Sequence, residues 1–308
     1  MTLPHRYRRP ARRPITRWDR KSVTRSPIGP PGSFLRDGKA CQAAPRGERG
    51  VAKTGESRKR EGVRQVFPNH DKVDPIDAYG RLDRLPDGRP RVRLNMIASL
   101  DGAAALAGRS GALGGSADKA LFAVLRSLAD VILVGAGTVR AEKYGPPHLD
   151  DEARGRRREA GLAEVPEIAV VTRSCHLEWE SKFFTEAQRR PVVVTVAGAD
   201  EASRRRADAV ADVLLAGDDD VDLAQAVQLL GERGHDNVLC EGGPGVAAQA
   251  AAAGVIDEVC LTVAPLVVGG DAHRILDGPE VDPAQRMHVV HVLEADSYLF
   301  MRYSRPPS

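Results

Sequence analysis

A carboxylate and a glycine-rich turn lie side by side in the segment CEGGPGVAAQ, residues 240–249. Glu241 closes an apolar run, and the Gly-Gly-Pro-Gly turn after it leads into an alanine-rich stretch typical of a helix. The N-terminus of such a helix offers backbone N–H groups and a positive dipole end to a pyrophosphate. A carboxylate beside that positive end is ionised and can accept hydrogen bonds from a polar ligand. The segment therefore predicts an anion site with Glu241 at its border.

Two further loops have the composition of ligand-binding turns. One is ASLDG, residues 98–102, followed by GRSGALGG, residues 108–115, with Ser116 as the expected N-cap of the next helix. The other is GAGTVRAEKYGP, residues 135–146, in which Thr138 either bonds a phosphate or ribose or only caps a helix. Each loop taken alone is also typical of an ordinary turn.

Other chemistries lack their signatures. The chain has no GxGxxG after its first strand, no P-loop GK[ST] and no HExxH, and its histidines suggest no Ser-His-Asp arrangement. The four cysteines are expected to be reduced thiols, because none shares a CxxC spacing; they are Cys41, Cys175, Cys240 and Cys260. We therefore expect neither a disulfide framework nor a metal site.

Short apolar, β-branched runs alternate with helical segments from about residue 74 onward. The predicted strands are residues 92–98, 131–135, 168–172, 192–196, 213–216, 237–241 and 259–268. The predicted crossover helices are residues 116–130, 221–234 and 243–254. After these, residues 287–304 have the pattern of an antiparallel hairpin that turns near residues 294–297. The pattern predicts an α/β fold with a mixed, mostly parallel sheet flanked by helices. The polar, charged segment 143–166 is expected to be a mobile surface excursion.

Charge is distributed unevenly along the 308 residues. Residues 1–65 carry 18 Lys and Arg against 5 Asp and Glu, a net charge of +13, so the remainder carries about −10 because the whole chain is +3. Such a stretch cannot bury enough apolar surface to offset its ordering entropy. We expect residues 1–72 to be a disordered basic extension, and residues 73–308 to form the folded domain. The extension is interpreted as a solvated tail or as the product of a start codon placed too far upstream; an Arg-rich arm or a transit segment is the alternative.

With no long apolar run and no secretory signal pattern, the protein is expected to be soluble and cytoplasmic.

In combination, five segments closely resemble the reductase domain of riboflavin biosynthesis, the C-terminal domain of RibD, which has a dihydrofolate-reductase-like fold. They are VRLNMIASLDG, GRSGALGG, LRSLADVILVGAGTVRAE, CEGGPGVAAQ and DEVCLTVAPLVVGG, in the same order and spacing over residues 91–303. The resemblance implies reduction by NADPH of the ribosyl group of an aminopyrimidine ribosylamine 5′-phosphate to a ribityl chain. It also implies a homodimer acting on a small molecule, with no nucleic-acid or membrane partner.

The resemblance assigns roles to individual residues. It implies that Asp101, Ser110, Arg126 and Glu241 contact the substrate and that Glu241 and Asn95 take part in catalysis. The implied coenzyme contacts are Ala112, Thr138, Glu142, Thr172, Gly242, Gly243, Pro244, Gly245 and Val246. Arg126 and Asp101 also have structural readings, as a solvated helix residue and as a turn-forming residue.

Two positions depart from the bifunctional bacterial pattern. Asn95 stands where those proteins carry a Lys, and the segment after Glu142 lacks an expected Arg, which leaves the proton donor and the phosphate partner open. No zinc deaminase signature of the type HxE…PCxxC is present, so a stand-alone reductase is expected. The resemblance leaves open whether the substrate is deaminated. The alternatives are a reductase that has drifted to a pterin or folate, a regulatory protein that retains only the coenzyme site, and an RNA-associated protein using the basic extension.

Overall fold

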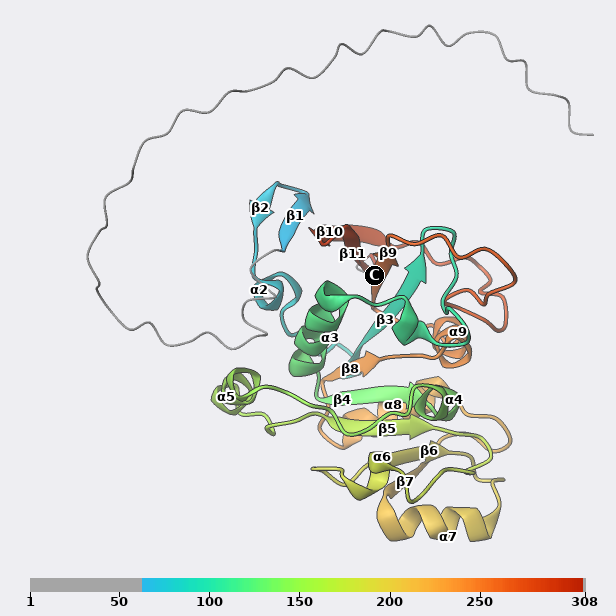
Figure 1. The fold of residues 1–308 in the computed structure, drawn as a ribbon. Coiled ribbons are helices and arrows are strands. Elements are labelled where there is room, and N and C mark those ends of the chain that lie inside the picture. The colour runs from blue at the N-terminus through green and yellow to red at the C-terminus, as the bar shows by residue number, and fades with distance from the viewer. Residues whose placement is uncertain (1–62, 307–308) are drawn as a thin grey trace, which may run out of the picture. The chain divides into compact units, whose positions relative to one another are not determined.

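Each apolar run that predicted a strand forms one in the computed structural model, which describes residues 63–306 (Figure 1). These strands are β3 (Arg91–Ser99), β4 (Val131–Gly135), β5 (Glu167–Val171), β6 (Val192–Thr195), β7 (Asp212–Leu215), β8 (Asn237–Cys240) and β9 (Glu258–Ala264). All seven run parallel, in the order β9-β3-β8-β4-β5-β6-β7. Their carboxyl ends consequently meet at one edge of the sheet, where open α/β sheets bind ligands.

The predicted C-terminal hairpin extends this sheet. Strands β10 (His288–Ala295) and β11 (Tyr298–Ser304) pair antiparallel, and β11 also pairs antiparallel with β9. The turn between them has positive φ at Asp296 and Ser297. The predicted α/β class, with a mixed and mostly parallel sheet and a C-terminal antiparallel hairpin, is confirmed.

Two strands at the start of the described residues were not expected. β1 (Arg64–Phe67) pairs with β10, and β2 (Asp71–Lys72) pairs with β1. Residues 64–67 and 71–72 thus belong to the sheet, and placing them in a disordered extension was wrong. Their apolar content is small, and tertiary pairing with β10 rather than local pattern makes them strands. The rest of the predicted extension, with Cys41, lies outside the described residues.

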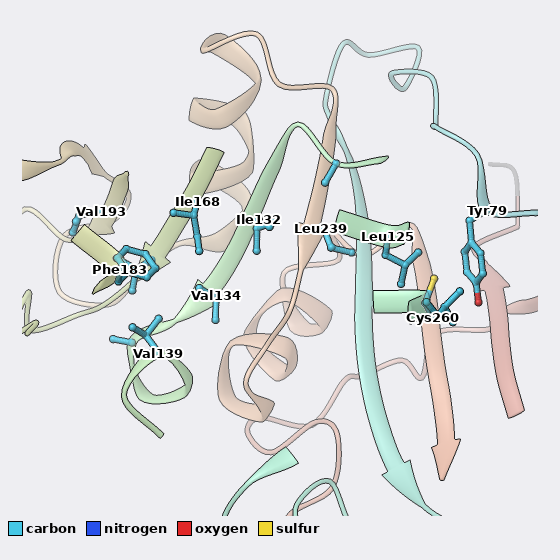
Figure 2. Packing of buried hydrophobic residues seen from close by; sticks show 14 of the residues in the cluster. Tyr79, Leu125, Ile132, Val134, Val139, Ile168, Phe183, Val193, Leu239 and Cys260 are labelled. Atoms are coloured by element: carbon cyan, nitrogen blue, oxygen red, sulfur yellow. The ribbon is translucent and has the colours of Figure 1, made fainter. Parts of the chain in front are cut away.

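Helices cover both faces of the sheet. The first face carries α2 (Pro75–Tyr79), α3 (Ser116–Leu128), α4 (Ala136–Ala141), α6 (Lys182–Thr185) and α7 (Glu201–Val210). The second carries α8 (Leu223–Glu232) and α9 (Pro244–Ala252). Figure 2 shows the first core layer running along the sheet from Val193 and Phe183 through Ile132 and Leu239 to Tyr79.

The segment 143–166 is more ordered than predicted. It contains helix α5 (Asp151–Glu159), whose N-cap Asp150 accepts a hydrogen bond from Ala153 N–H at 2.6 Å. Arg157 on this helix is buried and donates to the carbonyls of Ser127 and Ala129 at the end of α3. The polar composition concealed the helix because its anchor is an arginine that satisfies backbone carbonyls.

The start of α3 differs from the sequence prediction, and the cysteines agree with it. Gly115 rather than Ser116 is the N-cap of α3, so Ser116 is the first helical residue. Cys175, Cys240 and Cys260 are buried free thiols, as predicted. Within residues 63–306, no helix is long and apolar enough to cross a membrane, and no group of three or more metal-ligating side chains is present.

Candidate active site

Glu241 lies at the carboxyl edge of the sheet, one residue beyond β8. Its backbone N–H donates to the carbonyl of Leu133 on β4 at 2.9 Å, so the strand pairing continues through this residue. Its side chain is only 1% exposed. Leu94 pairs with Cys240, and the next residues on these parallel strands, Asn95 and Glu241, therefore share the face covered by α3.

Arg126 forms a bidentate ion pair with Glu241. Its Nε donates to Glu241 Oε1 at 2.7 Å and its Nη2 to Glu241 Oε2 at 2.8 Å. As a crossover helix, α3 runs against the direction of β8, and helical side chains point back toward their own N-terminus. The guanidinium in the last turn of α3 is thereby directed toward the carboxyl edge of the sheet.

Tyr144 completes a cluster of three with Arg126 and Glu241. Its hydroxyl donates to Glu241 Oε2 at 2.7 Å, and its ring centroid lies 5.3 Å from the Arg126 guanidinium. Sequence reasoning missed this residue. It follows the end of α4, where Tyr144 N–H donates to Val139 O at 2.9 Å and Lys143 adopts φ +51°. A left-handed residue with such a bond is typical of a helix C-terminal cap and fixes the side chain that follows it.

Burial and the contact with Glu241 shift the pKa values of Arg126 and Tyr144. Burial lowers the pKa of Arg126, but the carboxylate of Glu241 outweighs it and holds the pKa above its usual value. Burial, reinforced by the adjacent Glu241 carboxylate, raises the pKa of Tyr144 well above 10. At neutral pH the guanidinium of Arg126 and the protonated phenol of Tyr144 are therefore both directed at Glu241.

The glycine turn after Glu241 is tightly packed. Gly242 has φ +74°, and a Cβ there would lie 2.8 Å from the sulfur of Met96. A Cβ on Gly243, which is joined to Gly242 by a cis peptide bond, would lie 2.5 Å from Thr138 Oγ1. Gly135 N–H donates to Gly242 O at 2.6 Å, which joins this turn to the start of α4. The structure thus brings together Thr138 and the glycine turn, two regions predicted to contact the coenzyme.

The first turn of α9 fits a bound anion. Its N-cap is Gly243, which has no side chain to cap the first amide groups, and Pro244 is the first helical residue. The N–H groups of Gly245 and Val246 therefore have no side-chain acceptor at the N-cap, Gly245 is exposed, and a Cβ on it would meet only Asp277 O at 3.9 Å. A diphosphate is the kind of group that such a helix end accepts.

Glu142 holds the glycine-rich loop that contains Ser110. One carboxylate oxygen, Oε1, accepts from Ser110 N–H at 2.7 Å and from Ser110 Oγ at 2.9 Å. Arg109 lies 3.7 Å from the other oxygen. In this structure a predicted coenzyme contact and a predicted substrate contact bond to each other, and Ala112, in the same short 3₁₀ turn, is exposed.

Asp101 ties the turn after β3 to the loop after β9. Its carboxylate accepts from Ser99 Oγ at 2.6 Å and from the N–H groups of Val268 at 3.0 Å and Gly269 at 2.6 Å. These hydrogen bonds, led by that from Ser99, lower the pKa of Asp101 to about 2. Its described contacts are therefore those of a loop anchor.

The remaining predicted residues occupy separate positions. Asn95 is half-buried on β3 and pairs in register with Cys260 of β9. Thr172 lies just beyond β5, two strands from β8 in the sheet order, and its hydroxyl oxygen accepts from Cys175 N–H at 3.1 Å. Neither contacts the Arg126–Glu241 pair through any hydrogen bond found among residues 63–306.

Comparisons with known proteins agree with this geometry. The family model for the RibD C-terminal domain matches residues 90–299. The 2,5-diamino-6-ribosylamino-4(3H)-pyrimidinone 5′-phosphate reductase of Archaeoglobus fulgidus is 30% identical over 193 residues, which is 62% of this chain and 87% of the relative. The enzyme of the same name from Methanothermobacter thermautotrophicus is 30% identical over 198 residues, 63% of this chain and 87% of the relative. A solved pyrimidine reductase-like protein from Corynebacterium diphtheriae is 28% identical, has a TM-score of 0.66, and aligns over 76% of this chain and 99% of its own.

The parallel sheet, the carboxyl-edge cluster and these matches define an α/β oxidoreductase of the pyrimidine reductase type. The chain belongs to the RibD C-terminal domain family, with the family match covering residues 90–299. The expected family resemblance is thereby confirmed.

Proposed function

We propose that this protein reduces the ribosyl group of 2,5-diamino-6-ribosylamino-4(3H)-pyrimidinone 5′-phosphate, or of its deaminated counterpart, to the ribityl form. The observation that supports it most is the buried Glu241, paired with Arg126 beside an uncapped helix N-terminus at the carboxyl edge of a parallel sheet. Two relatives that share 30% of their aligned residues with this chain carry the name of that reductase.

NADPH is the proposed coenzyme and would supply the hydride. Its diphosphate would take the N–H groups of Gly245 and Val246 at the start of α9, with Thr138 beside the same turn. Glu142 would hold the Ser110 loop beside the end of α4 through its hydrogen bonds from Ser110 N–H and Ser110 Oγ, at 2.7 and 2.9 Å. Thr172 and Ala112 are further proposed contacts.

The chain's own contribution is positioning and electrostatics. Glu241, paired with the Arg126 guanidinium, would accept a hydrogen bond from a hydroxyl or amino group of the substrate. Arg126 uses Nε and Nη2 toward Glu241, so an anionic substrate group would meet its Nη1 side. Asn95, a neighbour of Glu241 on the same face, would orient the opened sugar so that hydride transfer becomes effectively unimolecular. Asp101 and Ser110 would shape the substrate side through their loops.

A cytoplasmic homodimer is the proposed assembly, without a nucleic-acid or membrane partner. Paired residues of β9 and β11 place an apolar set on the sheet face opposite α3, including Leu261 beside Met301 and Val263 beside Leu299. Leu299 is 37% exposed, and the others are only partly buried. A second copy of the chain would cover this face.

The decisive experiment measures NADPH oxidation by the full chain, by loss of nicotinamide absorbance, with three substrates in turn. These are the diaminopyrimidinone ribosylamine phosphate, its deaminated uracil counterpart and dihydrofolate. Turnover with either ribosylamine phosphate supports the proposal and identifies the substrate; turnover with dihydrofolate alone overturns it in favour of the folate alternative. Saturable NADPH binding without any turnover would favour the regulatory alternative.

A further inference from the structure

Tyr144 has a defined place in the site that none of the sequence motifs assigns. We propose that Tyr144 is a positioning residue for substrate binding, holding Glu241 and Arg126 in one fixed arrangement. This inference rests on the proposed function, because it concerns the substrate that Glu241 would bind.

The first argument is the count of acceptor positions on Glu241. A carboxylate offers about four lone-pair directions, two on each oxygen. Among residues 63–306, Oε2 accepts from both Arg126 Nη2 and Tyr144 OH, at 2.8 and 2.7 Å, whereas the one donor to Oε1 is Arg126 Nε, at 2.7 Å. The phenol hydroxyl thus occupies the second position on Oε2. The remaining position on Oε1 is left for a ligand donor.

The second argument is the enclosure of the guanidinium. Arg126 lies over the ring of Phe122 at 4.2 Å and over that of Tyr144 at 5.3 Å. Two aromatic rings and a bidentate carboxylate restrict its long side chain, which would otherwise lose rotamer entropy on binding a ligand. The Nη1 side of the guanidinium, which faces away from Glu241 because Nε and Nη2 bind the carboxylate, is therefore presented in a set direction.

The third argument is the segment that carries Tyr144. Glu142 and Tyr144 flank Lys143, whose left-handed conformation ends α4. Glu142 bonds the Ser110 loop while Tyr144 bonds Glu241. Three consecutive residues thus join the glycine-rich loop to the carboxylate cluster. A substrate that contacts Glu241 would meet a site already ordered by this segment, which lowers the cost of binding.

Tyr144→Phe in the full chain tests the proposal, because it keeps the ring over Arg126 and removes only the donor to Glu241. We expect KM for the ribosylamine phosphate to rise about tenfold, with kcat changed much less and NADPH affinity unchanged, since a hydrogen bond to a charged group is lost. Tyr79→Phe is the matched control. Its hydroxyl is buried and has no hydrogen-bond partner among the described residues, and it lies near Arg93, toward the opposite end of β3. We expect that control to leave KM unchanged.

An unchanged KM in active Tyr144→Phe protein would show that the phenol only fills space and would overturn the inference while leaving the proposed function standing. Wild-type protein that turns over neither ribosylamine phosphate overturns the proposed function instead. In that case thermal unfolding of Tyr144→Phe, Glu241→Gln and the double variant decides the positioning role. Shifts in Tm that simply add contradict it, and clear non-additivity supports it.

Discussion

Arg126 and Glu241 meet at 2.7 and 2.8 Å across the space between α3 and the end of β8, with 15% and 1% of their side chains exposed. Removing two charges from water is costly, and hydrophobic side chains of similar volume are often at least as stabilising as a buried ion pair. Stability alone is therefore a weak explanation for a buried pair at this edge of the sheet, where the ligand site is also expected.

Neutralising Glu241 should damage both folding and activity. Glu241→Gln leaves the Arg126 guanidinium without its counter-charge, so we expect a loss of about 3–5 kcal/mol in unfolding free energy. We also expect kcat/KM to fall ten- to hundredfold, because a charged acceptor for the substrate is lost. Urea unfolding and steady-state kinetics measure the two effects separately.

The double variant Arg126→Met with Glu241→Gln separates stability from function. With no uncompensated charge left, we expect most of the unfolding free energy to return while activity stays low. Recovery of both would mean that the pair is only structural, and recovery of neither would mean that the cluster cannot tolerate the change in shape.

Gly243→Ala should weaken coenzyme binding. Gly243 has φ −65°, which alanine tolerates, so the cost comes from a Cβ only 2.5 Å from Thr138 Oγ1. We expect the Kd for NADPH to rise at least about tenfold, because the turn that seats the diphosphate must shift. Fluorescence titration with NADPH measures this. Gly155→Ala in α5 is the control: its Cβ meets nothing closer than 3.9 Å, and it should leave Kd unchanged while raising stability by up to about 1 kcal/mol.

Asp101→Asn should loosen the loop after β9. The amide retains one acceptor oxygen, whereas the carboxylate accepts from the N–H groups of both Val268 and Gly269. We expect these two amides to exchange hydrogen at least about tenfold faster in the variant, since hydrogen bonds to an ionised acceptor are the stronger kind. Unchanged exchange at both positions would contradict the anchor role of Asp101.

The parallel strands could be predicted from sequence because each is an apolar run, and the Glu241 turn because one such run ends in a carboxylate and a Gly-Gly-Pro-Gly sequence. Other features could not, for reasons that particular residues make plain. Helix α5 is attached through buried Arg157, a residue type that local pattern assigns to the surface. Tyr144 lies in a polar segment, and the left-handed Lys143 before it, together with the hydrogen bond from Tyr144 N–H to Val139 O, directs it toward Glu241. The contact between Glu142 and Ser110 joins residues 32 apart, so neither signals it locally.

Burial of His291 should make the protein less stable in mild acid. His291 lies on β10, edge-on to the Tyr79 ring at a centroid distance of 4.7 Å, and its Nε2 has no hydrogen-bond partner among residues 63–306. Burial is the largest cause that lowers the pKa of His291 from 6.5 to about 4. The positive charges of Arg302 and Arg93 contribute to this lowering, and the carboxylate of Glu258 partly opposes them. The unfolded chain therefore binds a proton between pH 6.5 and 4 that the folded protein does not, so stability is full above pH 6.5 and falls as the pH drops toward 4. The shift corresponds to about 3 kcal/mol.

Urea unfolding of wild type and His291→Phe between pH 4 and 6.5 measures this loss of stability. Phenylalanine keeps the edge contact with Tyr79 but cannot titrate, so the variant should lose that part of the pH dependence. An equal slope in both proteins would assign the acid sensitivity to other groups.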